Sequence, residues 1–191
     1  MASTKELRKT LPRRAPNHER HLQDGMSQKT ATYSLVNLNA AQLKELEGTI
    51  NDEDADTDES SAKVANQPDF SGRTLRDVYD HHILMRDECD WMDPLYFIVA
   101  DQEDYKGKGL LVVNLCTFDS DDDDDDEGEE DDTGRIGVAR CSSDKAAGWV
   151  LCFKLAEMLW SELKYAEYKE WGGSNPYEKY DTAVAEGEKS R

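Results

Sequence analysis

The hydrophobic positions of the chain form two kinds of pattern, continuous apolar runs and stripes at helical spacing. The runs at 95–100 and 110–116 consist of residues that favour β-strands, which predicts two strands buried on both faces. A shorter run over 135–139 predicts a third strand, and residues 33–38 predict another near the start of the chain. The residues between the first two runs end in a Lys-Gly-Lys-Gly turn, so we expect a hairpin with an extended loop there.

Helical spacing is found in three segments. Asn39 is suited to cap a short helix, and Thr74 is suited to cap a second one that runs to about Glu88. The third segment starts at residues 142–144 and reaches Trp171, either as one helix or as two with a bend. The pattern predicts an α/β or α+β fold, with a mixed sheet of three to four strands packed against two or three helices.

Composition divides the chain into segments around this domain. The core domain is predicted over 68–171, and a short strand–helix piece precedes it at 33–50. The basic stretch 1–32 contains two prolines and no sustained period, so it is predicted as a disordered arm. The stretch 51–67 is predicted as an acidic linker, and 172–191 as a polar tail.

Nearly all of the net charge lies in two of these segments. The formal net charge is −19; the loop 119–132 holds 12 acidic residues in 14 positions, and 52–59 holds six in eight. Binding of nucleic acid requires cations that displace phosphate counterions, so DNA and RNA are not expected as direct partners. Basic proteins are candidate partners of the acidic loop, although such runs are more often simply solvated. The predicted contact residues of the loop are Asp121, Asp122, Asp123, Asp124, Asp125 and Asp126.

Targeting signals are few. No stretch approaches the roughly 20 apolar residues of a membrane span, and the first residues lack the apolar region of a secretory signal. The four cysteines form no Cys-x-x-Cys pair, so reduced thiols are expected. These features predict a protein of the cytoplasm or nucleus that does not contact membranes.

Residues with catalytic potential are also few. Motifs for phosphate or dinucleotide binding and the nucleophile elbow are missing from the sequence, so we expect no cofactor. His81 and His82, with Cys89 and Asp90, lack the paired spacing of zinc ligands, so no metal site is expected. Asp101 ends a predicted buried strand, where sites gather in α/β folds, and His82 is the second weak catalytic candidate. The alternatives are that Asp101 begins a turn and that His82 belongs to the apolar stripe of its helix.

Three tryptophans recur along the last helical segment. Trp149, Trp160 and Trp171 are 11 residues apart, which places them near one line of an α-helix. Core packing explains some of them, and exposed ones would form a protein-binding surface, because aromatic residues dominate interface hot spots. We therefore favour a non-enzymatic interaction module that binds proteins through this aromatic helix face or through the acidic loop. The alternative is a small enzyme or accessory factor that acts on a small molecule near Asp101.

Three motifs follow one another along the chain: Val99-Ala-Asp101, Leu110-Leu-Val-Val-Asn-Leu115 and Leu155-Ala-Glu-Met-Leu-Trp160. With these motifs, the order of elements over 74–170 resembles an uncharacterised family of small bacterial and fungal α/β domains, known only as a domain of unknown function. The resemblance implies a fold and brings no activity. Members of that family carry Asn and Asp where this chain has Glu157 and Leu159. If the family residues close a turn between two helices, their replacement predicts one continuous helix here.

Overall fold

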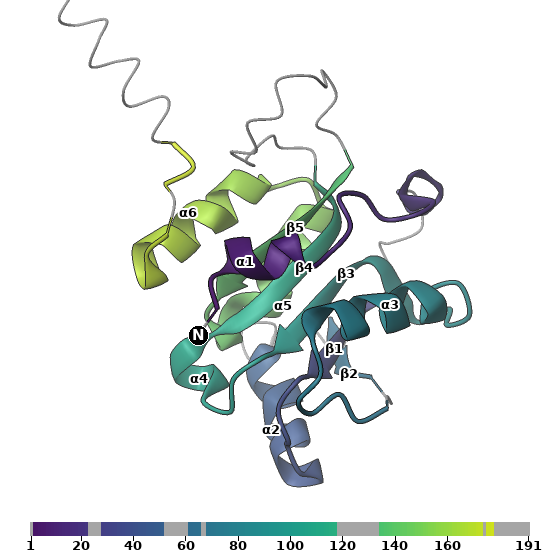
Figure 1. The fold of residues 1–191 in the computed structure, drawn as a ribbon, viewed down its shortest axis with the longest axis vertical. Helices are drawn as coiled ribbons and strands as arrows, with labels where there is room; N and C mark the ends of the chain where they lie inside the picture. Colours follow the sequence, from purple (N-terminus) through teal and green to yellow (C-terminus); the bar gives the residue numbers. More distant parts are fainter. Residues whose placement is uncertain are drawn as a thin grey trace, which may run out of the picture.

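The protein folds around one mixed β-sheet, shown as arrows in Figure 1. The computed structural model describes residues 2–22, 28–51, 61–65, 68–117, 134–173 and 175–177. The five strands lie in the order β2-β1-β3-β4-β5. β1 pairs in parallel with β2 and β3, whereas β3–β4 and β4–β5 are antiparallel. The strands are β1 (Lys29–Ser34), β2 (Ala62–Val64), β3 (Met92–Ala100), β4 (Leu110–Thr117) and β5 (Arg135–Cys141).

The α/β architecture is therefore confirmed, but the predicted number of three to four strands is wrong. The additional strand is β2, which lies inside the segment 51–67 that was predicted as a linker. Its three residues are too few to show an alternating pattern against an acidic background. Residues 52–60 and 66–67 of that segment lie outside the described residues, as does the acidic loop 119–132.

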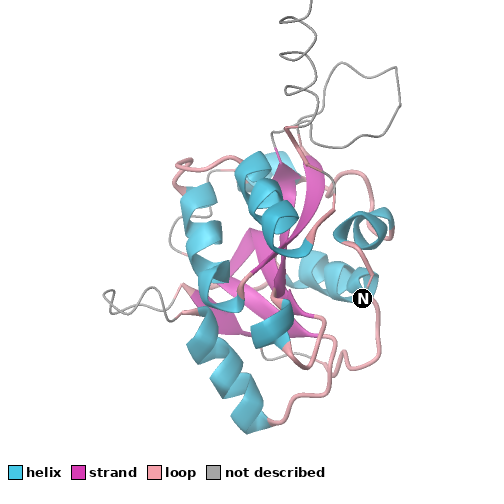
Figure 2. Cartoon of the chain, turned by 90° about the vertical axis from the view of Figure 1, so that its left-hand side faces the viewer, coloured by secondary structure: helices cyan, strands magenta, loops and turns pink. Residues whose placement is uncertain are grey.

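Helices cover both faces of the sheet. α1 and α3 lie on one face, whereas α2 and α5 lie on the other (Figures 1 and 2). Every residue of β3, β4 and β5 is consequently buried, which explains why these strands are continuous apolar runs in the sequence. The helices are α1 (Thr4–Lys9), η1 (His18–His21), α2 (Ala40–Ile50), α3 (Leu75–Met85), α4 (Tyr105–Lys108), η4 (Ser143–Lys145), α5 (Ala146–Lys154) and α6 (Trp160–Trp171).

Both helix caps predicted in the first half of the chain are confirmed. The Asn39 side chain accepts hydrogen bonds from the amides of Ala41 and Gln42 at the start of α2. The Thr74 side chain accepts one from the amide of Asp77 at the start of α3. Such caps satisfy amides that have no partner within the helix, so polar residues at these positions define where each helix begins.

The first segment of the chain is folded, which corrects the predicted disordered arm. α1 and the residues up to Arg14 lie against β5, with Leu11 buried and an amide hydrogen bond of 3.0 Å from Ile136 to the carbonyl of Arg13. Ala15 is buried as well, and η1 contacts β3. The helical pieces of this segment are only one or two turns long, so no periodic pattern marks them. Contacts with residues more than 100 positions away stabilise them instead.

Two side chains at the C-terminal end of α2 cover the outer edge of β2: Glu47 of the helix and Asn51, which directly follows it. The Asn51 amide group donates to the carbonyl of Ala62 (3.0 Å) and accepts from its N–H (2.9 Å). The Glu47 carboxylate accepts the N–H of Val64 at 2.7 Å. Asn51 and Glu47 thus replace a further strand, which protects the edge against pairing with another chain.

The substitution Asn51→Ala tests the role of this edge. We expect it to lower the free energy of unfolding by about 1–2 kcal/mol, because it leaves two main-chain groups of Ala62 without their partner. Aggregation during refolding should also increase, because the edge becomes available. Urea unfolding and light scattering measure the two effects, with Asn37→Ala at an exposed loop position as the control. Equal unfolding curves for the two variants would contradict this role.

Candidate functional site

The last helical segment is two helices joined by a sharp turn. α5 ends at Lys154 and α6 begins at Trp160, so of the two forms that the sequence left open, two helices with a bend is the one observed. The single helix that the resemblance implied through Glu157 and Leu159 is not formed. The amide of Glu157 donates to the carbonyl of Cys152 (2.9 Å), and that of Ala156 donates to Phe153 (3.1 Å). This pair of bonds is a Schellman motif, a common helix end.

Ala156 gives this turn an unusual backbone. Its φ angle is +54°, in the left-handed region that glycine usually occupies at this position of the motif. A residue with a Cβ atom is strained there, by about 1–2 kcal/mol. The sequence does not show this helix end, because it lacks the glycine that normally marks one.

Four large apolar side chains around this turn are exposed. The exposed fractions are 36% for Leu151, 43% for Leu155, 38% for Met158 and 60% for Leu159. We call these four residues the apolar corner. Elsewhere in the described part of the chain, only Leu22 and Leu84 are large hydrophobic residues with comparable exposure. The apolar corner is therefore a concentration of exposed apolar surface rather than the usual scatter.

Aromatic packing holds the apolar corner on the sheet. The Phe153 ring lies 6.2 Å from that of Tyr96, 6.0 Å from Trp149 and 5.5 Å from Trp160, measured between centroids. Trp160 is buried against Gly137 of β5, where a Cβ atom would come within 2.6 Å of the indole. Gly137 thus permits the close approach of α6 to the sheet.

A buried ion pair ties the end of α5 to the start of β3. The Lys154 ammonium lies 2.5 Å from the Asp93 carboxylate, and both side chains are almost fully buried. Lys154 also donates to the carbonyl of Gln28 at 2.7 Å. The second carboxylate oxygen of Asp93 accepts the amides of Leu95 and Tyr96. These contacts position the last turn of α5.

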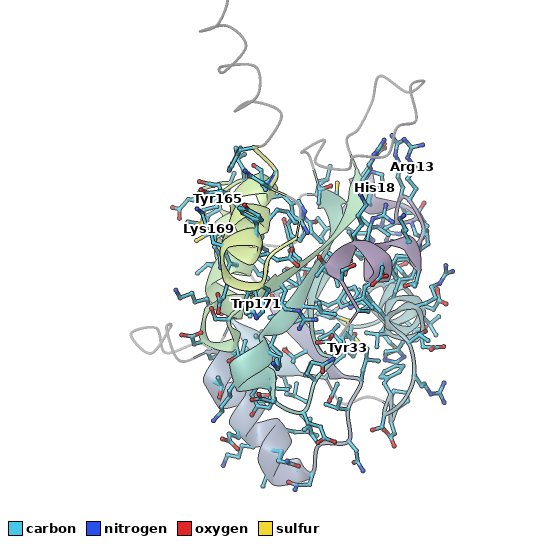
Figure 3. All side chains as sticks on the ribbon, turned by 60° about the vertical axis from the view of Figure 1, so that its left-hand side comes forward. Arg13, His18, Tyr33, Tyr165, Lys169 and Trp171 are labelled. Carbon is cyan, nitrogen blue, oxygen red and sulfur yellow. The ribbon has the colours of Figure 1, made fainter. Side chains whose placement is uncertain are left out.

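The three tryptophans do not form the predicted line, because they belong to two helices. Trp160 is buried, and half-buried Trp149 packs on Phe153. Half-buried Trp171 lies at the end of α6 beside Gly109, away from Tyr165 and Lys169 (Figure 3). The exposed apolar residues of this segment are leucines and a methionine, which the search for aromatic contact residues missed.

Asp101 is engaged in an ion pair with a residue that sequence reasoning missed. Arg140 donates from Nη1 to one oxygen of Asp101 (2.9 Å) and from Nη2 to the other (2.6 Å). The guanidinium is almost fully buried and also donates to the carbonyl of Lys108 at 3.2 Å. Both carboxylate oxygens of Asp101 thus accept hydrogen bonds from Arg140. Through these bonds and the one to Lys108, Arg140 of β5 connects the end of β3 with the residues before β4.

His82 is fully buried against β1 and β3. Its Nδ1 lies 3.0 Å from the hydroxyl of Tyr33, and its ring centroid lies 4.6 Å from that of Phe97. Burial lowers the pKa of His82 to about 3, so the imidazole is neutral. Asp101 and His82 have different partners, and the contacts found in the described residues do not join them in one site.

No three His, Cys, Asp or Glu side chains gather as a possible metal site in the part of the chain that the structure describes. None of the helices in that part is long and apolar enough to cross a membrane. The candidate contact residues 121–126 lie outside it.

Comparison with known proteins adds no relative. No protein-family model, curated protein or solved structure matches the chain. The resemblance to a domain of unknown function stays a prediction. The apolar corner is therefore interpreted from its own geometry.

The strain at Ala156 can be measured by substitution. We expect Ala156→Gly to raise the free energy of unfolding by roughly 0.5–1 kcal/mol, because glycine adopts this φ without strain. Ala166→Gly, inside α6, is the matched control and should lower it by roughly 0.5–1 kcal/mol. Urea unfolding measures both values. A loss of stability in Ala156→Gly as large as in the control would contradict the strained turn.

Burial of His82 predicts a pH dependence of stability. The unfolded chain binds a proton at His82 near pH 6.5 and the folded protein only near pH 3. The stabilisation is thus complete above pH 6.5 and is lost as the pH falls, by about 1.4 kcal/mol per pH unit. His82→Asn should be less stable at neutral pH, with a slope that is shallower by about one proton between about pH 6 and pH 4. Urea unfolding at a series of pH values gives the slope of the free energy of unfolding against pH for both proteins. Equal slopes in the wild type and in His82→Asn would show that a group other than His82 causes the pH dependence.

Proposed function

We propose that the chain is a non-enzymatic interaction module that binds another protein through the apolar corner. The observation that supports this function is the exposure of Leu151, Leu155, Met158 and Leu159 within nine consecutive positions. This surface replaces the predicted aromatic helix face as the contact region of the last two helices.

Exposed apolar side chains favour a partner for energetic reasons. Full burial of a leucine or methionine side chain contributes roughly 1.5–3 kcal/mol, and the four residues are already about half buried. A partner that covers them gains a few kcal/mol from this contact before the cost of association. Soluble monomers rarely keep such a cluster in water unless it binds something.

The apolar corner is also presented on a backbone that is held in place. The Schellman bonds of Glu157 and Ala156 close the turn, and the Lys154–Asp93 pair anchors the helix before it. Side chains on such a support lose little conformational entropy on binding, because their backbone is already ordered. The geometry therefore suits a docking surface.

The acidic loop 119–132 is a second proposed contact, supported by its charge. Its 12 acidic residues attract a basic surface over a distance set by ionic strength. No observation favours the enzyme alternative, because Asp101 pairs with Arg140 and His82 is enclosed in the core.

The proposal is tested by capturing proteins from an extract of the source organism. The double variant Leu155→Ser/Leu159→Ser should lose about 90% or more of a specifically captured protein, because it removes the most exposed apolar area. Leu84→Ser changes an equally exposed leucine on α3 and should capture as the wild type does. Circular dichroism and urea unfolding establish that all variants fold.

A variant without residues 119–132 separates the two contacts. Loss of partner only in this variant would assign binding to the acidic loop and not to the apolar corner. Undiminished capture by the Leu155→Ser/Leu159→Ser variant would contradict the proposed function of the apolar corner.

A further inference from the structure

The exposed charged residues within the segment of the apolar corner, 151–162, are both acidic. The segment 151–162 contains three charged residues, Lys154, Glu157 and Glu162. Lys154 is buried against Asp93, so its charge is neutralised and kept from solvent. Glu157 and Glu162 are exposed. A partner therefore meets leucine and methionine side chains with carboxylates beside them.

Glu162 is held next to the most exposed residue of the apolar corner. Its carboxylate accepts the amide of Leu159 at 2.7 Å, at the start of α6. The negative charge thus has a defined place beside the Leu159 side chain. A cation of a partner that covers Leu159 comes within a few ångströms of this carboxylate, where attraction is effective even in physiological salt.

Charge argues against a second copy of the chain as the occupant. Each copy carries a formal net charge of −19, and the same two glutamates would meet across a symmetric contact. Like charges brought together in this way oppose association. The complementary partner has a positive charge.

The backbone geometry favours a helical partner over an extended one. An extended peptide binds by adding to a free strand edge, but Asn51 and Glu47 cover β2, and Arg13 contacts β5. At the apolar corner itself, the amides of Ala156 and Glu157 are used within the turn. Binding there must rely on side chains. A helix satisfies its own main-chain groups and presents an apolar stripe, so it fits this surface.

We infer that the partner segment bound by the apolar corner is a basic amphipathic helix. Its apolar stripe covers Leu155, Met158 and Leu159, and its Lys or Arg side chains lie against Glu157 and Glu162. This inference rests on the proposed function and names the chemical class of the partner.

Three synthetic peptides of about 18 residues, long enough for five turns, test the inference with the full chain. The first has a leucine stripe with lysines, the second the same stripe with glutamates, and the third the composition of the first with scrambled leucines. Fluorescence anisotropy measures binding of each labelled peptide at about 0.05 M and about 0.5 M salt. The leucine–lysine peptide should bind at least about tenfold more tightly than either of the others.

Matched variants locate the binding. Leu155→Ser/Leu159→Ser should weaken the leucine–lysine peptide by about tenfold or more, and Leu84→Ser should leave it unchanged. Glu157→Gln/Glu162→Gln should weaken binding of the leucine–lysine peptide by about three- to tenfold and reduce the salt dependence of that binding. The reason is that the lysines of the peptide lose the two carboxylates that attract them. Glutamine at 162 keeps an oxygen that can accept the Leu159 amide, so the turn is retained.

The other outcomes overturn the inference in distinguishable ways. Equal binding of the leucine–glutamate peptide would remove the charge requirement. Binding that survives Leu155→Ser/Leu159→Ser would show general attraction to an acidic protein. A dimer in sedimentation velocity that is lost in that variant would make a second copy the occupant. If no peptide binds while the extract still yields a corner-dependent partner, the proposed function stands and the basic helix is wrong.

Discussion

The structure depends on the burial of both faces of its central sheet. Once helices cover both faces, every main-chain group of β3 and β4 must be paired within the sheet, because no water reaches it. The two outer strands, β2 and β5, each have one edge without a neighbouring strand, so their main-chain groups there need other partners. β2 receives the side chains of Asn51 and Glu47, and β5 receives the carbonyl of Arg13. The folded first segment of the chain follows from this need, since it covers an edge that would otherwise pair with another molecule.

The buried pair of Lys154 and Asp93 places the apolar corner relative to this sheet. Removing one partner of such a pair typically costs roughly 3–5 kcal/mol, because the other charge is left uncompensated in the interior. The pair therefore holds the end of α5 to the start of β3. Lys154 is also the last residue of α5, so the turn begins directly after this fixed point. The strained Ala156 is tolerated because these surrounding contacts determine where the chain goes next.

The sequence predicted those features that depend on neighbouring residues. The continuous runs of β3 and β4 and the caps Asn39 and Thr74 could all be recognised locally. Features that depend on residues elsewhere in the chain could not be predicted from the sequence. β2 is three residues long and is completed by Asn51, 11 positions earlier than Ala62.

The same distinction explains the candidate site residues. Asp101 was found, but its role depends on Arg140, whose position beside it follows from the pairing of β4 with β5. His82 was correctly placed on an apolar stripe, and the structure shows that the whole ring is enclosed. The tryptophan line was wrong because a helix end without glycine gives no signal at Ala156. Lys154 shows why the exposure of each charge had to come from the structure. It is the one cation between Leu151 and Leu159 in the sequence, so the sequence alone would place a positive charge on this surface. Its burial against Asp93 leaves Glu157 and Glu162 to determine the charge of the surface, and so which partner that surface can attract.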